Sequence, residues 1–244
     1  MSLNQVNQEF NDAFETYFPK QNPLVRLAYG VLTVGLSGGL KLRRRLFGGR
    51  VLVNERIVEY PQILRWLRPQ GTALDIGCVS SRLPIQLASL GYTVHGVDVR
   101  PYPFHHPNFT FHRADLFTWT PPQRYDILLL ISAIEHFGIG GYGDLQLEDA
   151  DFQALERITP WLAPGGQLLV SLPFGQAAVT NKHRIYDQAR LTRLFADFIW
   201  VEEAYFQRID GAWRPSTAAA LAEVASPGLP TNGVAILHLQ PKGG

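Results

Sequence analysis

The segment Ala73–Pro84 (ALDIGCVSSRLP) constrains the fold of this chain more than any other part of it. It reads as a short apolar strand, a glycine turn and the start of a helix. Asp75 stands near the end of the strand, and Gly77 leaves room for a ligand to approach the backbone. In an open α/β sheet, ligands bind beyond the carboxyl ends of the strands. The segment therefore predicts a nucleoside site at the edge of a parallel sheet.

The rest of the chain alternates strands with helices, which is typical of a parallel sheet. The stretch 125–131 (YDILLLI) is almost continuously apolar, as buried parallel strands are. Gly91 and Asp187 are predicted to cap helices. No helix of crossover length separates the last two strands, so we expect them to pair antiparallel. Strands are predicted at 73–76, 93–98, 109–112, 125–131, 167–172, 198–208 and 233–240, and helices at 82–90, 145–162 and 188–196.

Composition favours one globular α/β domain with an appendage, because 46% of the 244 residues are hydrophobic and 18% are charged. A net charge of +1 gives no overall field that would recruit nucleic acid, so no nucleic-acid partner is expected. The single cysteine, Cys78, excludes an internal disulfide. His105 and His106 are neighbours in a proline-rich loop, and no carboxylate spacing supports them with His112, so no metal site is expected.

Residues 24–40 form an apolar run that contains Arg26 and four glycines, and the basic segment 41–50 (KLRRRLFGGR) follows it. The run is shorter than the roughly 20 apolar residues of a membrane-spanning helix. Two interpretations stay open: a helix packed on the main domain, or peripheral contact of residues 24–50 with an anionic membrane surface. We expect residues 1–54 to be a helical arm or membrane-surface segment, and 55–244 to be the main domain. With no signal-peptide pattern, a cytoplasmic protein is expected, which the second interpretation would place at the inner face of a membrane.

Apolar residues recur at helical spacing between residues 50 and 67. Ile57, Tyr60, Leu64 and Leu67 follow this spacing, with Val58 and Ile63 beside them. Pro61 lacks a backbone N–H and predicts a break or a new first turn.

Two further carboxylates follow predicted strands. Asp98 closes the strand TVHGVD, 23 residues after Asp75, and a carboxylate there can accept hydrogen bonds from both hydroxyls of a ribose. Asp115 follows the next strand, where it could accept from the amino group of an adenine. Each aspartate alone is more simply a turn or helix cap. The order of all three predicts an adenosine-containing ligand.

At this point the chain resembles class I S-adenosylmethionine-dependent methyltransferases from about Glu55 to Gln240. ALDIGC, VHGVDVR, FHRADLF and YDILLLISAIEHFG resemble that family's first four motifs, and LAPGGQLLVSLPFG resembles the stretch through its fifth strand. The resemblance implies a Rossmann-like, doubly wound α/β sheet of about seven strands, mostly parallel with a reversed last strand. It also implies S-adenosylmethionine as the cofactor.

The resemblance assigns cofactor contacts by position. The methionine end would lie against Asp75 and Gly77, with Cys78 and Ser80 in the same loop, and Ser132 would lie near the sulfonium. The adenosine would be held by Asp98 at the ribose, by Val99 and Leu116 on either side of the adenine, and by Asp115 at its amino group.

The first motif departs from the family, because Val79 and Ser81 stand where glycines are usual. A β-branched valine does not easily adopt positive φ. The loop is therefore either a variant that meets the cofactor through Gly77 and Ser80 or Ser81, or the relic of a site that has decayed.

Glu135 and His136 follow the fourth predicted strand, in a turn where both could reach the pocket. We predict His136 as the base that takes a proton from the acceptor, and Glu135 as its partner or an anchor of the cofactor loop. A structural histidine held by backbone is the alternative. Asp144 is predicted to cap the next helix. The cluster 181–187 (NKHRIYD) offers Lys182, His183 and Arg184 to an acidic acceptor, or is a solvated loop.

Three function classes stay open. The first is methyl transfer to an oxygen or nitrogen of a small-molecule or glycan acceptor. The second is a catalytically decayed methyltransferase fold that acts as a binding or regulatory module, which Val79 favours. The third is a nicotinamide-dependent oxidoreductase, against which Asp115 and the Glu-His turn count. The sequence does not identify the acceptor.

Overall fold

The structure is a computed structural model that describes residues 54–140, 147–226 and 231–243. The predicted N-terminal arm or membrane-surface segment and the capping role of Asp144 lie outside the described residues. Within the described ranges, no helix combines the length and apolar character needed to cross a bilayer.

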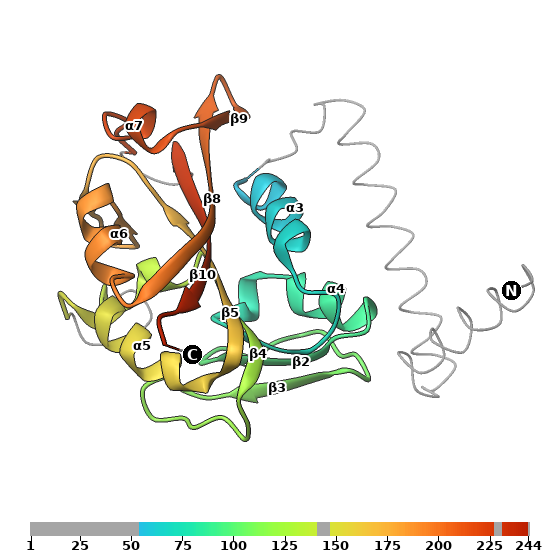
Figure 1. Ribbon diagram of the computed structural model, residues 1–244. Coiled ribbons are helices and arrows are strands. Elements are labelled where there is room, and N and C mark those ends of the chain that lie inside the picture. The colour runs from blue at the N-terminus through green and yellow to red at the C-terminus, as the bar shows by residue number, and fades with distance from the viewer. Residues whose placement is uncertain (1–53, 141–146, 227–230, 244) are drawn as a thin grey trace, which may run out of the picture. The chain divides into compact units, whose positions relative to one another are not determined.

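A single eight-stranded sheet organises the described chain (Figure 1). Its order is β3-β2-β1-β4-β5-β10-β8-β9, in which the first five strands run parallel and β10 runs antiparallel to both of its neighbours. This confirms the doubly wound, mostly parallel sheet with a reversed last strand. The strands are β1 (Thr72–Ile76), β2 (Thr93–Asp98), β3 (Phe109–Arg113), β4 (Tyr125–Ile131), β5 (Leu162–Pro173), β8 (Phe198–Ile209), β9 (Ala212–Ser216) and β10 (Gly233–Pro241).

The eighth strand, β9, falls in a region that the sequence pattern assigned to a connection. Asp210 and Gly211 have φ values of 50° and 79°, and they join β8 to β9 in a tight hairpin. A two-residue loop with positive φ at both positions matches the twist of antiparallel strands, and Asp-Gly is a preferred sequence for it. The hairpin signal was present in the sequence and was missed.

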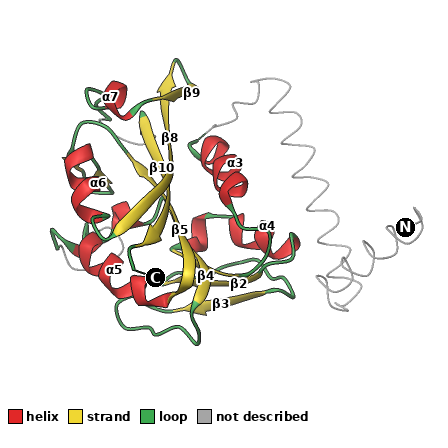
Figure 2. Ribbon diagram, viewed as in Figure 1, coloured by secondary structure: helices red, strands yellow, loops and turns green. Residues whose placement is uncertain are grey.

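Helices cover both faces of the sheet (Figures 1 and 2). Those on one face pack on Ile127 and Leu129 of β4, and those on the other pack on Leu128 and Leu130, as the alternation of side chains along a strand requires. The first face carries α3 (Arg56–Trp66) and α4 (Leu83–Ser89), and the second carries α5 (Ala150–Ile158) and α6 (Gln188–Leu194).

The remaining elements are short. They are the 3₁₀ turns η1 (Cys78–Ser80), η2 (Ile134–His136) and η3 (Thr159–Trp161), the helix α7 (Ala218–Leu221), and a two-stranded ribbon of β6 (Ala178–Val179) and β7 (Arg184–Ile185). The helix expected at 145–162 is shorter in the structure: α5 ends at Ile158, the 3₁₀ turn η3 follows it, and β5 begins at Leu162 rather than at Gln167.

Helix α3 buries a different set of residues from the apolar positions that gave the helical spacing in the sequence. Ile57 and Leu64 are exposed, whereas Glu59, Ile63 and Trp66 are buried. Pro61 lies inside the helix and does not break it. The carbonyl that loses its donor to Pro61 belongs to Ile57, which faces solvent, so water can satisfy it. The spacing of apolar residues cannot predict that a helix buries a carboxylate such as that of Glu59.

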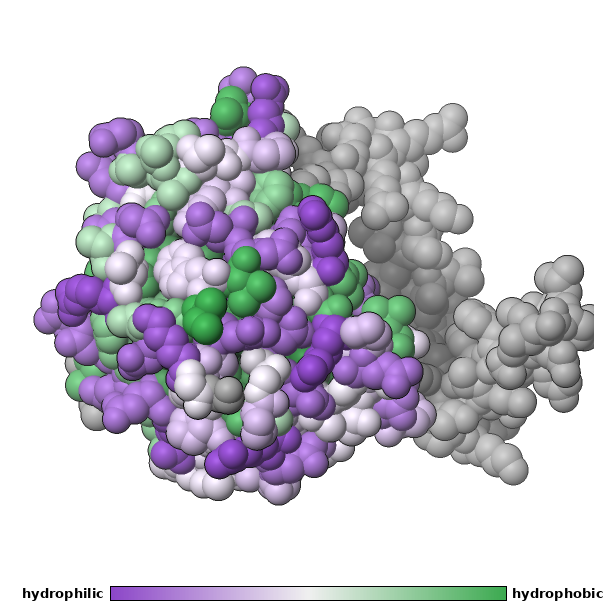
Figure 3. All heavy atoms as spheres, in the orientation of Figure 1, coloured by the Kyte–Doolittle hydropathy of each residue, from purple (hydrophilic) through white to green (hydrophobic). Residues whose placement is uncertain are grey.

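The face shown in Figure 3 is mostly hydrophilic, with hydrophobic residues in separate spots. Strand β8 leaves Ile199 and Val201 exposed. Scattered apolar residues of this kind are usual on protein surfaces.

Candidate functional site

A cavity of about 760 Å³ lies at the carboxyl ends of the parallel strands. Residues that follow or end β1, β2, β3 and β4 contribute to its wall, as the strand-end rule predicts. The structure brings together in this wall most of the residues selected from the sequence: Gly77, Ser80, Asp98, Val99, Asp115, Leu116, Ser132, Glu135 and His136.

The loop after β1 explains the unusual first motif. Gly77 has a φ of 76°, and a Cβ added there would lie 2.8 Å from the Cβ of Ala133, so the turn requires glycine. Val79 sits in the 3₁₀ turn η1 with negative φ, and its N–H donates to Oδ2 of Asp98 at 3.0 Å. The valine therefore needs no left-handed conformation.

Ser81 does not face the cavity. Its Oγ accepts from the N–H of Leu83 at the start of α4 and lies 2.7 Å from the hydroxyl of Tyr60. Ser80 is the serine of this loop that lines the cavity.

Asp75 and Cys78 lie behind the cavity wall. Asp75 is buried, and its Oδ2 has no hydrogen-bond partner among the described residues. Burial raises the pKa of Asp75 to about 7, with Arg56 opposing the effect and Asp98 adding to it. Cys78 packs on β2, where a Cβ at Gly96 would meet its Sγ at 2.8 Å, and burial raises the pKa of the thiol.

The two carboxylates of the predicted adenosine end already have partners. Asp98 accepts from the backbone N–H of Arg100 at 2.9 Å and from its Nε and Nη2 at 3.2 and 3.1 Å. Asp115 accepts at Oδ1 from the N–H of Phe117 at 2.9 Å, which is the turn cap expected as its structural alternative. Arg100 also lines the cavity, and the sequence reading did not single it out.

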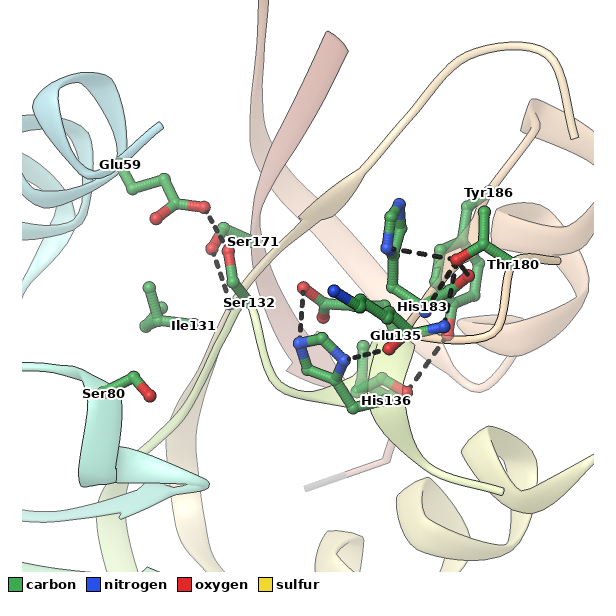
Figure 4. A network of polar contacts seen from close by, with 12 residues as sticks. Glu59, Ser80, Ile131, Ser132, Glu135, His136, Ser171, Thr180, His183 and Tyr186 are labelled. Carbon is green, nitrogen blue, oxygen red and sulfur yellow. Dashed lines mark hydrogen bonds and ion pairs between the residues drawn. The ribbon is translucent and has the colours of Figure 1, made fainter. Parts of the chain in front are cut away.

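Helix α3 supplies two residues that sequence reasoning missed. Nη1 of Arg56 donates to Glu59 at 2.8 Å and to the carbonyl of Ile131 at 3.0 Å. Glu59 is fully buried and accepts at Oε1 from the hydroxyl of Ser132 at 2.7 Å (Figure 4). Burial raises the pKa of Glu59, and the Arg56 charge and the Ser132 hydrogen bond oppose this. Helix α3 is thereby fixed to the end of β4.

Ser132 itself has a φ of 46°, which is rare for a residue with a side chain. Its N–H donates to the carbonyl and to the hydroxyl of Ser171 on β5, at 3.0 and 3.1 Å. Strained backbone held by surrounding hydrogen bonds tends to cluster at functional sites.

Glu135 and His136 lie together in the turn η2 after β4. Oε1 of Glu135 is 3.8 Å from Nε2 of His136, and Nδ1 of His136 is 2.6 Å from the carbonyl oxygen of Lys182 (Figure 4). A carbonyl accepts only, so Nδ1 carries a proton and the neutral ring presents Nε2 as a base, a tautomer that we assign from this contact.

Glu135 is almost completely buried, and its Oε2 lacks a hydrogen-bond partner in the described structure. Burial raises its pKa to about 8, backbone hydrogen bonding and Arg56 lower it, and Glu59 raises it further. A buried polar atom without a partner costs about 1–3 kcal/mol.

The cluster after β6 is divided in the structure. Arg184 is buried, 3.5 Å from Oδ2 of Asp151, and donates to the carbonyl of Glu148, so its expected pairing with an acidic acceptor is wrong. His183 is buried too but lines the cavity, and burial together with His136 lowers its pKa.

Two other expectations concern caps and metals. Asp187 accepts from the N–H of Arg190 at 2.7 Å and caps α6, as predicted. His112 lies 3.2 Å from His95, and the described residues include no group of three histidine, cysteine or acidic side chains arranged to hold a metal ion.

Comparison with solved structures identifies the fold. The 1,6-didemethyltoxoflavin-N1-methyltransferase of Burkholderia thailandensis, solved with its substrate and S-adenosylhomocysteine, matches at a TM-score of 0.53 and 17% identity over 92% of each chain. The N-methyltransferase NodS of Bradyrhizobium japonicum matches at 0.53 and 14% identity, over 77% of this chain and 96% of that one. The chain has the class I S-adenosylmethionine-dependent methyltransferase fold.

A SAM-dependent methyltransferase from Methanosarcina mazei matches this fold at a TM-score of 0.51 and 14% identity, over 75% of this chain and 98% of that one. A family model described as a Caenorhabditis protein of unknown function, DUF268, matches residues 118–213. No curated protein matches the chain. In this fold, the cavity of the chain lies at the carboxyl ends of β1, β2, β3 and β4.

Proposed function

We propose that this protein transfers a methyl group from S-adenosylmethionine to an oxygen or nitrogen of a small-molecule or glycan acceptor. The observation that carries this proposal is the convergence of Gly77, Asp98 and Asp115 with the Glu135–His136 turn on one cavity. Ligand contacts from several strand ends and a buried acid beside a histidine are what such a reaction needs.

The residues of the cavity fit the cofactor. Gly77 leaves its backbone open where a Cβ has no space, and Asp98 offers two oxygens to a ribose once Arg100 moves aside. Asp115, Val99 and Leu116 would surround the adenine, and Ser80 and Ser132 the methionine. Arg56 lines the same wall, where its positive charge would attract the methionine carboxylate while its Nη1 stays bonded to Glu59 and to the Ile131 carbonyl.

The cofactor, when bound, supplies an electrophilic methyl group. The task of the chain is then to align the acceptor, exclude water and remove one proton. His136 holds its base nitrogen toward Glu135 because the Lys182 carbonyl fixes the other nitrogen. Phe117 and Phe137, whose rings contact each other edge to face, add apolar surface to the cavity wall.

One observation favours the alternative of a binding or regulatory module without catalysis. Arg100 occupies the carboxylate of Asp98, where a ribose would bind. Val79 no longer supports that alternative, because its conformation in η1 is unstrained.

Calorimetry with S-adenosylhomocysteine, followed by transfer of labelled methyl groups to cell extract, separates these two functions. Catalysis predicts binding and label transfer, and the module predicts binding without transfer. The absence of both heat and a thermal shift would reject methyl transfer. His105→Gln is a matched control for His136→Gln, because His105 lies outside the cavity lining.

Residues 24–50 carry a separate proposal, that the protein is cytoplasmic with peripheral contact at the inner face of a membrane. Flotation with anionic liposomes tests it. A protein that stays at the bottom of the gradient would contradict the membrane contact.

A further inference from the structure

One corner of the cavity is formed by three side chains from two loops. Glu135 and His136 come from the turn η2 after β4, and His183 comes from the loop between β6 and β7; all three line the cavity. The contact of 2.6 Å between His136 and the Lys182 carbonyl ties the two loops together (Figure 4).

This corner contains two buried polar atoms without hydrogen-bond partners among the described residues, Oε2 of Glu135 and Nε2 of His183. Elsewhere, two arginines that line the cavity are paired with acids. Arg100 holds Asp98, and Arg56 holds Glu59. The torsion that turns a glutamate carboxyl group is soft, so a small rotation presents either oxygen of Glu135 to the cavity.

The charges around this corner disfavour an anionic acceptor. Glu59 lies close enough to raise the pKa of Glu135, and the nearby cation Arg56 is engaged by Glu59 and by the Ile131 carbonyl. Arg184, which could have attracted an anion, pairs with Asp151 on the far side of its loop. A carboxylate or phosphate here would lie close to a second buried acid, Glu59.

The unpartnered oxygen of Glu135 can accept a hydrogen bond. A hydroxyl offers one hydrogen, which can satisfy only one of the two groups. A neutral primary amine offers two, so it can bind to Glu135 and to a histidine at the same time and keep its lone pair for the methyl group.

From this arrangement, and resting on methyl transfer as the function, we propose that the acceptor is a primary amine held by Glu135 and His183. The nitrogen lone pair forms the bond to the methyl carbon while the carbon–sulfur bond breaks, and that electron pair stays on sulfur. The proton that the nitrogen loses goes to the Glu135–His136 pair. The acceptor atom is then nitrogen rather than oxygen.

The test uses three probes of one skeleton: phenethylamine, 2-phenylethanol and phenylacetate. An aryl group suits a wall that contains Phe117 and Phe137. Each probe is titrated by calorimetry into the full chain, with and without saturating S-adenosylhomocysteine. The proposal predicts that the amine binds at least ten times more tightly than the alcohol, and that phenylacetate binds least.

Variants make the test specific. Glu135→Gln and His183→Gln should each weaken amine binding at least fivefold and leave S-adenosylhomocysteine affinity within twofold. Asp115→Asn is the matched control, since it should weaken S-adenosylhomocysteine and leave the amine unaffected. Circular dichroism establishes that each variant is folded, and two independent substitutions keep the test valid if one of them is not.

The outcomes separate this proposal from the function on which it rests. Equal or tighter binding of the alcohol or acid, unchanged amine affinity in both variants, or no binding of the amine would overturn the amine assignment while S-adenosylhomocysteine still binds. If the unmodified protein binds the amine but does not bind S-adenosylhomocysteine, methyl transfer is overturned. The titration without cofactor makes this outcome visible, because it measures amine binding to Glu135 and His183 by itself.

Discussion

The carboxyl groups in two regions of the cavity differ in their hydrogen bonding. At the end predicted for adenosine, Asp98 and Asp115 accept hydrogen bonds from backbone N–H groups, and Asp98 also from Arg100. At the other end, Glu135 is buried with an unpartnered oxygen and a pKa raised to about 8. The first arrangement suits recognition and the second suits proton transfer, because perturbed acids in clefts mark sites of chemistry.

The largest expected effect tests the proton-transfer end. His136→Gln should lower turnover about 10²–10⁴-fold, the usual contribution of a general base. Affinity for S-adenosylhomocysteine should stay within twofold, because the contacts proposed for the adenosine come from the other end. Steady-state kinetics and calorimetry measure the two quantities, with His105→Gln as the control. Unchanged turnover would remove His136 from the mechanism.

The second prediction concerns stability and pH. The raised pKa of Glu135 means that the folded protein keeps a proton that the unfolded chain has released, so stability is lost as pH rises from about 4.5 to about 8. Glu59 and Arg56 face the same carboxyl group and remain in the variant.

The free energy of unfolding should therefore fall less in Glu135→Gln than in the parent protein between pH 5 and pH 8.5. The difference between the two decreases should reach about 2–4 kcal/mol at pH 8.5. Asp75, with its pKa raised to about 7, contributes in the same direction in both proteins and cancels in the difference. Urea unfolding at several pH values measures this. Parallel pH profiles would show that Glu135 ionises normally in the folded state.

The third prediction concerns the recognition end. Asp98→Asn should weaken S-adenosylhomocysteine binding about 10–100-fold, since it converts charge-assisted hydrogen bonds to the ribose into weaker ones. Binding of phenethylamine should be unaffected. If both ligands weakened alike, the two ends would not be independent and the comparison would fail.

The smallest expected effect comes from Arg100. In the absence of cofactor its guanidinium holds Asp98, so a ribose must displace it. Arg100→Ala should raise S-adenosylhomocysteine affinity about 2–10-fold, the size expected from removing one partly exposed ion pair. The exposed Arg113 supplies a matched control in Arg113→Ala. A loss of affinity in Arg100→Ala would mean that the arginine binds the cofactor instead.

Local patterns predicted the strands and the residues at their ends. The strand 125–131 and the cap Asp187 were recognised because their signals lie within a few residues. Arg56 and Glu59 were missed because their partners, Ile131 and Ser132, lie more than seventy positions away in sequence. Arg100 was missed for a different reason, since an arginine after a strand gives no sign of folding back onto Asp98.

The structure also shows which features of the family pattern this chain needs. Gly77 has to be glycine, because its Cβ would clash with Ala133. Position 79 does not, because a 3₁₀ turn replaces the left-handed residue there. A departure from a motif is therefore informative only when the backbone at that position is known.

A crystal structure of the full chain with S-adenosylhomocysteine tests the central claim most directly. The account predicts the ribose on Asp98 with Arg100 displaced, the adenine amino group beside Asp115, and the sulfur facing the Glu135–His136 turn. A ligand bound elsewhere, or crystals soaked at saturating concentration in which Arg100 still holds Asp98 and the cavity is empty, would contradict it.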